Sequence, residues 1–177
     1  ESALEHPVAG IPVCFDLDDY FKRIHTLQKT APLSVYTGVE CGMQLITDVV
    51  DKNKALCQDK EFDYIIGSLH LVDGKDPYYP SFWENQEPAE CIQTYFEKIY
   101  DNITTFHEMD SLGHLDYIVR YAPTDYKYQP EQFREILEAI LQTLIQKDLA
   151  LEINTSGFKT PLSRQNPHEK IIEWYLA

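Results

Sequence analysis

Four polar side chains of the kinds that bind metal ions or phosphate groups lie at similar places along this sequence. Glu40, His70 and His114 each follow a short apolar segment, and Asn154 closes another. Imidazole nitrogen and carboxylate oxygen together suit Zn, Mn or Fe, and a carboxylate can bridge two ions. Any one of these residues alone is more often a solvated or structural side chain. Three of them at equivalent positions are harder to explain in that way, so the pattern alone leaves a metal site and separate structural roles as equal alternatives.

The segments around these residues predict a chain in which strands and helices alternate. Apolar residues recur every three or four positions in the helical segments, most clearly over 130–147. We predict strands over 11–15, 33–38, 62–67, 113–119 and 149–154. We predict helices over 17–29, 44–58, 89–106, 130–147 and 167–176, and a long loop over 73–88. Such alternation implies βαβ units and a parallel sheet, with a barrel as the main alternative.

A parallel arrangement would bring the candidate ligands together. In a parallel barrel the C-terminal ends of the strands meet at one mouth, which is where such proteins place their active sites. Nucleotide-binding versions of this architecture have no support, because the sequence contains neither G-x-G-x-x-G nor G-x-x-x-x-G-K-[ST]. We therefore expect the polar side chains that follow the strands to form one site.

Composition and charge argue against several classes of partner. The chain has 177 residues, the size of one domain, and we treat 1–177 as a single domain. Its 15 Lys and Arg against 29 Asp and Glu give a net charge of −14, which argues against binding to nucleic acid or to an anionic membrane surface. No apolar run reaches the roughly 18 residues of a membrane span. The four cysteines form no C-x-x-C pair, so we expect reduced thiols and a cytoplasmic protein.

Four strings of this sequence resemble one known family, in order and over nearly the whole chain. They are Gly38-Val-Glu40, then 63–79 with Asp-Tyr-Ile-Ile-Gly-Ser-Leu-His and Val-Asp-Gly-Lys-Asp-Pro-Tyr-Tyr, then 113–121 with Gly-His-Leu-Asp-Tyr-Ile-Val-Arg-Tyr, and 151–157 with Leu-Glu-Ile-Asn-Thr-Ser-Gly. These strings closely resemble the histidinol-phosphate phosphatases of the PHP (polymerase and histidinol phosphatase) superfamily.

The resemblance implies a fold, a reaction and a set of ligands. The fold would be α/β, a distorted (β/α)7 TIM-like barrel with its metal site at the C-terminal ends of the parallel strands. Two or three divalent ions (Zn, Mn or Fe) would activate a hydroxide that attacks phosphorus, so that L-histidinol phosphate becomes L-histidinol and phosphate in histidine biosynthesis. Glu40 matches the family's metal-bridging glutamate, and His70 and His114 match two of its histidine ligands. Bound ions would also explain how so acidic a chain takes an anionic substrate.

Three further residues are candidates for substrate binding on the same resemblance. Arg120 resembles a family arginine near the substrate phosphate, and a planar guanidinium suits a phosphate, although an arginine there could equally lie on the surface. Asn154 and Ser156 belong to a string that lines the mouth in the family, with structural capping as an equal alternative. Asp116 would share a strand face with His114, and could orient an imidazole or cap the chain.

Three ligand-bearing motifs of the family have no counterpart in this sequence. These are His-x-His on the first strand, Thr-Asp-His or Thr-Glu-His after the second, and Asp-x-His on a last strand. The Glu5-His6 pair resembles the second motif only superficially, since it precedes the expected strand. Either the sequence is an incomplete part of a normal enzyme or the protein is degenerate. We favour the first, because a barrel without its closing strands would expose sheet edges.

Two other functions stay open at this point. One is a PHP-type phosphoesterase that acts on another small phosphate ester or on a nucleotide. The other is a non-catalytic PHP relic that binds a metabolite or a partner protein. The extended match over 72–79 favours the histidinol phosphatase branch, whereas the missing motifs are the only support for a relic. The sequence does not predict an oligomeric state.

Overall fold

The structure, a computed structural model, describes residues 7–8, 11–12, 16–58 and 62–177. Its helices are α1 (Leu17–Thr30), α2 (Thr47–Gln58), α3 (Pro88–Thr105), α4 (Arg134–Gln146) and α5 (Glu169–Leu176). Its strands are β1 (Pro7–Val8), β2 (Ile11–Pro12), β3 (Gly38–Gly42), β4 (Tyr64–Ser68), β5 (Ser111–Leu112) and β6 (Ala150–Leu151). Short 3-10 helices cover η1 (Pro80–Phe82), η2 (Tyr117–Tyr121), η3 (Pro130–Phe133) and η4 (Thr155–Lys159).

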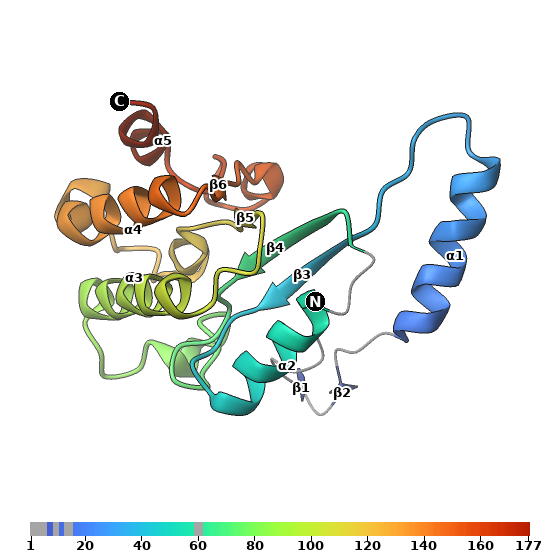
Figure 1. Cartoon of the computed structure of the whole chain (residues 1–177). Coiled ribbons are helices and arrows are strands. Elements are labelled where there is room, and N and C mark those ends of the chain that lie inside the picture. The colour runs from blue at the N-terminus through green and yellow to red at the C-terminus, as the bar shows by residue number, and fades with distance from the viewer. Residues whose placement is uncertain (1–6, 9–10, 13–15, 59–61) are drawn as a thin grey trace.

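Four parallel strands form the central sheet, in the order β3-β4-β5-β6 (Figure 1). Helices α2, α3 and α4 form the successive crossovers between these strands. Glu40 in β3 lies opposite Ile66 in β4, and Ile66 lies opposite Ser111 in β5. The predicted parallel α/β architecture is therefore confirmed. Within the described residues the sheet is open, and β1 and β2 form a separate antiparallel pair.

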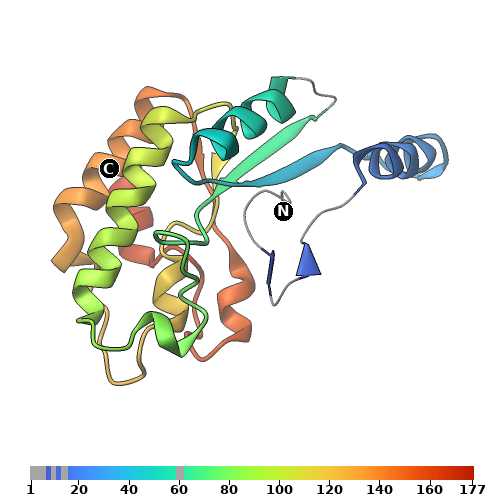
Figure 2. The same cartoon turned by 90° about the horizontal axis from the view of Figure 1, so that it is seen from below.

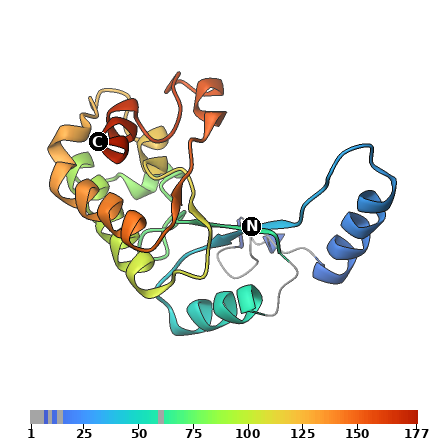
Figure 3. The same ribbon diagram turned by 45° about the horizontal axis from the view of Figure 1, so that its top comes forward.

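The core lies between the sheet and the helices that follow β4. Helices α3, α4 and α5 gather at the β5–β6 end of the sheet (Figures 1 and 3). The fully buried side chains of α3 and α4 include Ile92, Tyr95, Phe96, Ile99, Ile103, Leu137, Ile140 and Leu144. Each such side chain stabilises the fold by about 1.5–3 kcal/mol relative to an exposed one. This packing gives the site a rigid support on the side of β5 and β6.

Helix α2 covers the other end of the sheet, beside β3. The side-chain amide Nδ2 of Asn53 donates to the carbonyl of Gly42 at 2.8 Å, and both Asn53 and Cys57 are buried. The helix predicted from residue 44 begins only at Thr47, and Leu45 and Ile46 before it are exposed. The first turn of the predicted helix is therefore wrong, because residues 43–46 connect the end of β3 to α2.

Helix α1 confirms the prediction over 17–29 but buries none of its residues. It extends away from the rest of the molecule (Figures 1 and 2). Its contacts with the body include the Tyr20 hydroxyl, which donates to the carbonyl of Gly38 at 2.8 Å, and a ring contact between Phe21 and Phe62. Among the helices of the described residues, none has the length and apolar character that crossing a membrane requires.

The strand predicted over 33–38 is wrong in its position. The observed strand β3 begins where the prediction ended, so that Glu40 lies inside the strand. The Asp63 carboxylate accepts hydrogen bonds from the backbone N–H of Thr37, at 2.7 Å, and from its hydroxyl, at 2.9 Å. These bonds fix the start of the β3–β4 pair immediately after Thr37.

The predicted strand over 113–119 is also wrong. The chain leaves the sheet after Leu112, because His114 adopts a positive φ of 23° and turns the backbone away. The carbonyl of His114 then accepts from the N–H of Tyr117 at 2.7 Å, which starts the 3-10 helix η2. The premise that Asp116 and His114 share a strand face therefore fails.

The remaining predictions hold with different bounds. The strand predicted over 149–154 is observed over Ala150–Leu151. The 11–15 strand is described only over Ile11–Pro12, which pairs with β1 in the antiparallel pair and not in the parallel sheet. Residues 1–6 and 13–15, including His6, lie outside the described residues. The helix predicted over 89–106 is observed as α3, and the helix over 130–147 is observed as η3 followed by α4. The helix over 167–176 is observed as α5, which begins only at Glu169. The loop over 73–88 contains the short helix η1.

Gly157→Ala should destabilise the loop that follows β6. A Cβ atom on Gly157 would lie 2.2 Å from the backbone carbonyl oxygen of Arg164, which cannot rotate away as a side chain could. We expect the free energy of unfolding to fall by about 1–3 kcal/mol, the usual cost of overpacking. Urea unfolding would measure this change. The exposed neighbour Thr155→Ala is the control and should stay within about 0.5 kcal/mol of the parent; equal stability of both variants would contradict the prediction.

Candidate metal centre

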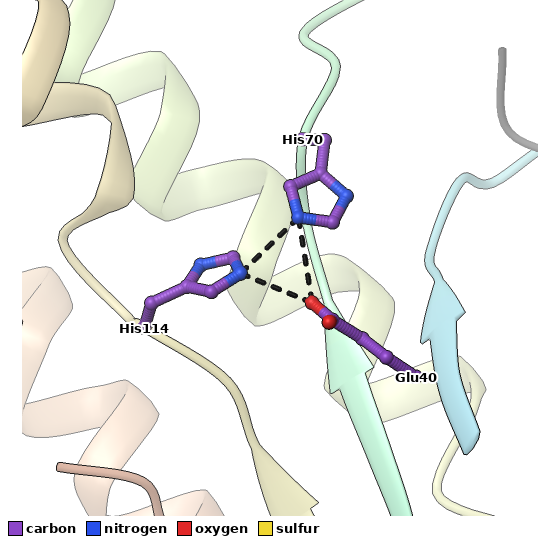
Figure 4. A group of neighbouring side chains, drawn as sticks. All are labelled: Glu40, His70 and His114. Carbon is purple, nitrogen blue, oxygen red and sulfur yellow. Dashed lines mark hydrogen bonds and ion pairs between the residues drawn. The ribbon is translucent and has the colours of Figure 1, made fainter. Parts of the chain in front are cut away.

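The three predicted metal ligands come together at the C-terminal side of the sheet. Glu40 lies within β3, His70 lies two residues beyond β4, and His114 lies two residues beyond β5. Figure 4 shows the three side chains pointing toward one another. Parallel strands place their C-terminal ends at the same edge, which is why residues so distant in sequence meet here.

The ligand atoms of this triad, Glu40, His70 and His114, are close to one another. His114 Nε2 lies 3.2 Å from Glu40 Oε1 and 3.1 Å from His70 Nε2, and His70 Nε2 lies 3.5 Å from Glu40 Oε1. One candidate ligand atom from each residue lies within 4.8 Å of the others. The relative exposure of the side chains is 31% for Glu40, 17% for His70 and 9% for His114. The triad is thus recessed but open to a small ligand.

The spacing of these atoms fits a bound divalent ion. Ligand atoms that surround a tetrahedral zinc ion at bonds of about 2.0–2.1 Å lie roughly 3.3 Å apart. The three separations within the triad, 3.1, 3.2 and 3.5 Å, lie on either side of that value. Two imidazole nitrogens and one carboxylate oxygen are also a donor set that zinc, manganese and iron accept. The residues present therefore fit the kind of metal that the sequence predicts.

The charge of Glu40 is stabilised by its two neighbours. Partial burial raises the pKa of the Glu40 carboxyl, but the hydrogen bonds to His114 and His70 outweigh that effect and hold the pKa well below its usual value. Glu40 is consequently ionised at any physiological pH. An ionised carboxylate is the form that binds a cation.

The backbone of His114 is held by a carboxylate that directly follows the next strand of the sheet, β6. The N–H of His114 donates to Glu152 Oε2 at 2.7 Å, and the N–H of Glu152 donates to the carbonyl of Leu112 at 3.0 Å. Among the described residues, the His114 Nδ1 atom is buried without a hydrogen-bond partner. Glu152 was not among the predicted site residues, although it lies in one of the strings that carry the resemblance.

Tyr117 is a second residue that sequence reasoning missed. The ring centroid of Tyr117 lies 4.8 Å from the ring centroid of His114 and 5.2 Å from that of His70. The guanidinium carbon of Arg120 lies 5.5 Å from the centroid of the Tyr117 ring. Burial and the neighbouring Tyr121 raise the pKa of the Tyr117 hydroxyl far above its usual value, so the side chain stays neutral. Tyr117 therefore packs between both histidines and the arginine.

The three candidate substrate-binding residues form a separate group. Arg120 Nη2 donates to Ser156 Oγ at 2.8 Å and to Asn166 Oδ1 at 3.0 Å, and the Ser156 hydroxyl donates to Asn154 Oδ1. Asn154 Nδ2 in turn approaches Glu152 at 3.3 Å. The structure thus brings Arg120, Asn154 and Ser156 together, and a chain of hydrogen bonds through Glu152 connects them with the backbone of His114.

Asp116 lies behind this group and is fully buried. Its carboxylate accepts from Asn166 Nδ2 and from the N–H of His168 at 2.9 Å, and it forms an ion pair with Arg164 Nη1 at 3.1 Å. None of these bonds goes to an imidazole ring. Asp116 therefore fixes the loop that precedes α5 and does not orient His114 by a hydrogen bond.

Comparison with known families identifies the chain. The PHP domain family matches residues 5–156. The chain belongs to the PHP family. The PHP match includes all three residues of the triad and extends through Ser156.

Curated proteins that are similar to this chain are named histidinol-phosphatases. A protein from Clostridium acetobutylicum named "Probable histidinol-phosphatase" is 32% identical over 153 residues, which cover 86% of this chain and 58% of the relative. The histidinol-phosphatase of Lactococcus lactis is 31% identical over 169 residues, which cover 93% of this chain and 62% of the relative. This PHP chain therefore spans about 60% of the length of the curated relatives it matches.

Solved structures of PHP relatives share the fold. The crystal structure of histidinol phosphate phosphatase from Lactococcus lactis, complexed with zinc, L-histidinol and phosphate, matches with a TM-score of 0.84 at 29% identity, and covers 94% of this chain and 64% of that one. A structure from Listeria monocytogenes matches with a TM-score of 0.73 at 20% identity, and covers 91% of this chain and 66% of that one. The α/β fold is therefore the TIM-like fold of the PHP histidinol phosphatases.

Proposed function

We propose that this chain carries part of a metal-dependent phosphomonoesterase that hydrolyses L-histidinol phosphate to L-histidinol and phosphate. The observation that carries the proposal is the triad, in which two imidazoles and one ionised carboxylate converge at the spacing of ligands around one ion. The names of the similar curated proteins support the choice of substrate. We place the reaction in histidine biosynthesis in the cytoplasm, with two or three ions of Zn, Mn or Fe as cofactors.

Each residue of the site has a defined part in this proposal. Glu40, His70 and His114 would hold the metal. Divalent ions at such a site would neutralise phosphate oxygens and activate water for attack on phosphorus. Arg120 would bind the phosphate, since its Nη2 atom is already held by Ser156 and Asn166, which fixes the plane of the guanidinium.

The sharpest test measures metal content and phosphate release on the same preparation. We expect protein purified without chelator to hold two or three ions of Zn, Mn or Fe by elemental mass spectrometry. The loaded protein should release phosphate from L-histidinol phosphate faster than from a nucleoside monophosphate or another small phosphate ester. His70→Ala should lose metal and activity together, whereas the exposed histidine of a matched control, His107→Ala, should keep both.

The outcomes of this test separate the alternatives. Protein that stays free of metal after soaking in Mn²⁺ or Zn²⁺ would overturn the proposal and leave a non-catalytic relic. Protein that binds metal but prefers another phosphate ester or a nucleotide would keep the phosphoesterase chemistry and replace the substrate.

A further inference from the structure

His114 adopts a backbone conformation that its residue type disfavours. Its φ of 23° is positive, and L-residues with a Cβ atom adopt such conformations at a cost, so the surrounding structure must enforce it. The conformation is nevertheless needed, because it turns the chain out of β5 and aims the imidazole at Glu40 and His70. Some contact must therefore hold the backbone at this residue.

The side chain of His114 is not held in the usual way. A histidine that binds a metal almost always donates its second ring N–H to a carboxylate, a carbonyl or water, which fixes the orientation of the ring. In the part of the chain that the structure describes, Nδ1 of His114 is buried and has no such partner. Apart from the contacts of Nε2 with Glu40 and His70, the direction of the ring comes from its backbone and from packing against Tyr117.

The backbone of His114 is held by one charged acceptor. Glu152 Oε2 accepts the N–H of His114 at 2.7 Å, a charge-assisted hydrogen bond of the stronger kind. The backbone of Glu152 is itself fixed against Leu112, and its carboxylate is approached by Asn154 Nδ2 at 3.3 Å. The acceptor thus lies directly after β6, and its own N–H ties it to the last residue of the neighbouring strand β5.

We infer that Glu152 is a positioning residue for the metal site, which holds the backbone of His114 so that its imidazole completes the triad. This inference rests on the proposed metal-binding function. The bond from Glu152 to the triad goes to the backbone N–H of His114 and not to a ligand atom, so Glu152 acts through His114. Within the described residues Nδ1 has no partner, and the bond to Glu152 is the one that a carboxylate makes to the backbone N–H of His114, while its carbonyl accepts from Tyr117.

The test compares Glu152→Ala with Glu152→Gln by titration with Co²⁺. The absorption spectrum of bound Co²⁺ reports the geometry of its ligands, and its intensity reports occupancy. Glu152→Ala should weaken Co²⁺ binding by about 10- to 100-fold, the usual effect of losing a residue that orients a ligand, and should alter the spectrum. Glu152→Gln keeps an oxygen that can accept the N–H of His114, so it should stay within about 3-fold of the parent.

Each outcome of the titration decides between explanations. An unchanged affinity and spectrum in Glu152→Ala would overturn the inference, provided that the parent protein binds Co²⁺. Equal losses in both variants would also overturn it, because the charge and not the backbone acceptor would then matter. A parent protein that binds no Co²⁺ would instead contradict the proposed metal site itself. Urea unfolding of both variants would show whether any loss of binding follows from loss of the fold.

Discussion

Glu40→Gln should abolish high-affinity metal binding while leaving the fold intact. The carboxylate of Glu40 is ionised and lies 3.2 Å from His114 Nε2 and 3.5 Å from His70 Nε2. An amide of the same shape removes the only negative charge of the triad, and a neutral amide oxygen is a much weaker ligand for a divalent ion. We expect Zn²⁺ affinity to fall by at least about 100-fold, because the loss of a residue that only orients a metal ligand already lowers affinity by up to about 100-fold. Calorimetric titration with Zn²⁺ would measure the affinity.

A matched substitution controls for the loss of one negative charge from an acidic chain. Glu135 lies exposed in the first turn of α4, so Glu135→Gln should bind Zn²⁺ like the parent protein. Circular dichroism should show the same helix content in both variants. Wild-type Zn²⁺ affinity in Glu40→Gln would remove Glu40 from the ligand set.

Asp116→Ala should cause a larger loss of stability than Gly157→Ala or any substitution in the triad. Asp116 is fully buried, and its carboxylate pairs with Arg164 at 3.1 Å while it accepts from Asn166 and from the N–H of His168. Alanine leaves the Arg164 guanidinium, whose side chain is only 16% exposed, without its countercharge. Removing one partner of a buried ion pair typically costs about 3–5 kcal/mol. That is a large part of the roughly 5–15 kcal/mol by which a domain of this kind is stable.

Urea unfolding at neutral pH would measure the effect of Asp116→Ala. The comparison is Asp19→Asn, which breaks an exposed ion pair with Arg23 on α1 and should cost less than about 1 kcal/mol. Similar stability of the two variants would show that burial of Asp116 carries no special cost. A parent-like Zn²⁺ affinity in whatever folded Asp116→Ala remains would separate the support of the loop from the metal centre.

The meeting of Glu40, His70 and His114 could be predicted from the sequence because each lies within or just beyond a recognisable strand. Glu40, His70 and His114 differ from their surroundings in residue type, and parallel topology alone suffices to bring them together. The exact ends of the strands could not be predicted. The β3 boundary depends on bonds between Asp63 and Thr37, which join residues that no local pattern connects.

The support around the triad could not be predicted for a related reason. Glu152 accepts a backbone N–H from a residue that follows the neighbouring strand, and Tyr117 acts by packing, so neither leaves a periodic or compositional signal. The buried position of Asp116 depends on Arg164 and Asn166, which lie about 50 residues further along the chain. The one feature of the sequence that could have indicated Glu152 as a site residue is its place directly before Ile-Asn-Thr-Ser, in a string that carries the family resemblance.

The wide spacing of the ligands along the chain also bears on how the protein matures. Glu40 and His114 are 74 residues apart, and Glu152, which holds His114, directly follows a still later strand, β6. Contacts between such distant segments form late in folding, after the entropy of closing long loops has been lost. A chain emerging from the ribosome therefore acquires the complete triad only after β5 has been made, and its restraint only after β6. If the triad binds metal as proposed, capture by all three ligands should accordingly follow the pairing of β3, β4 and β5, and bound metal would stabilise the finished fold over its incomplete precursors.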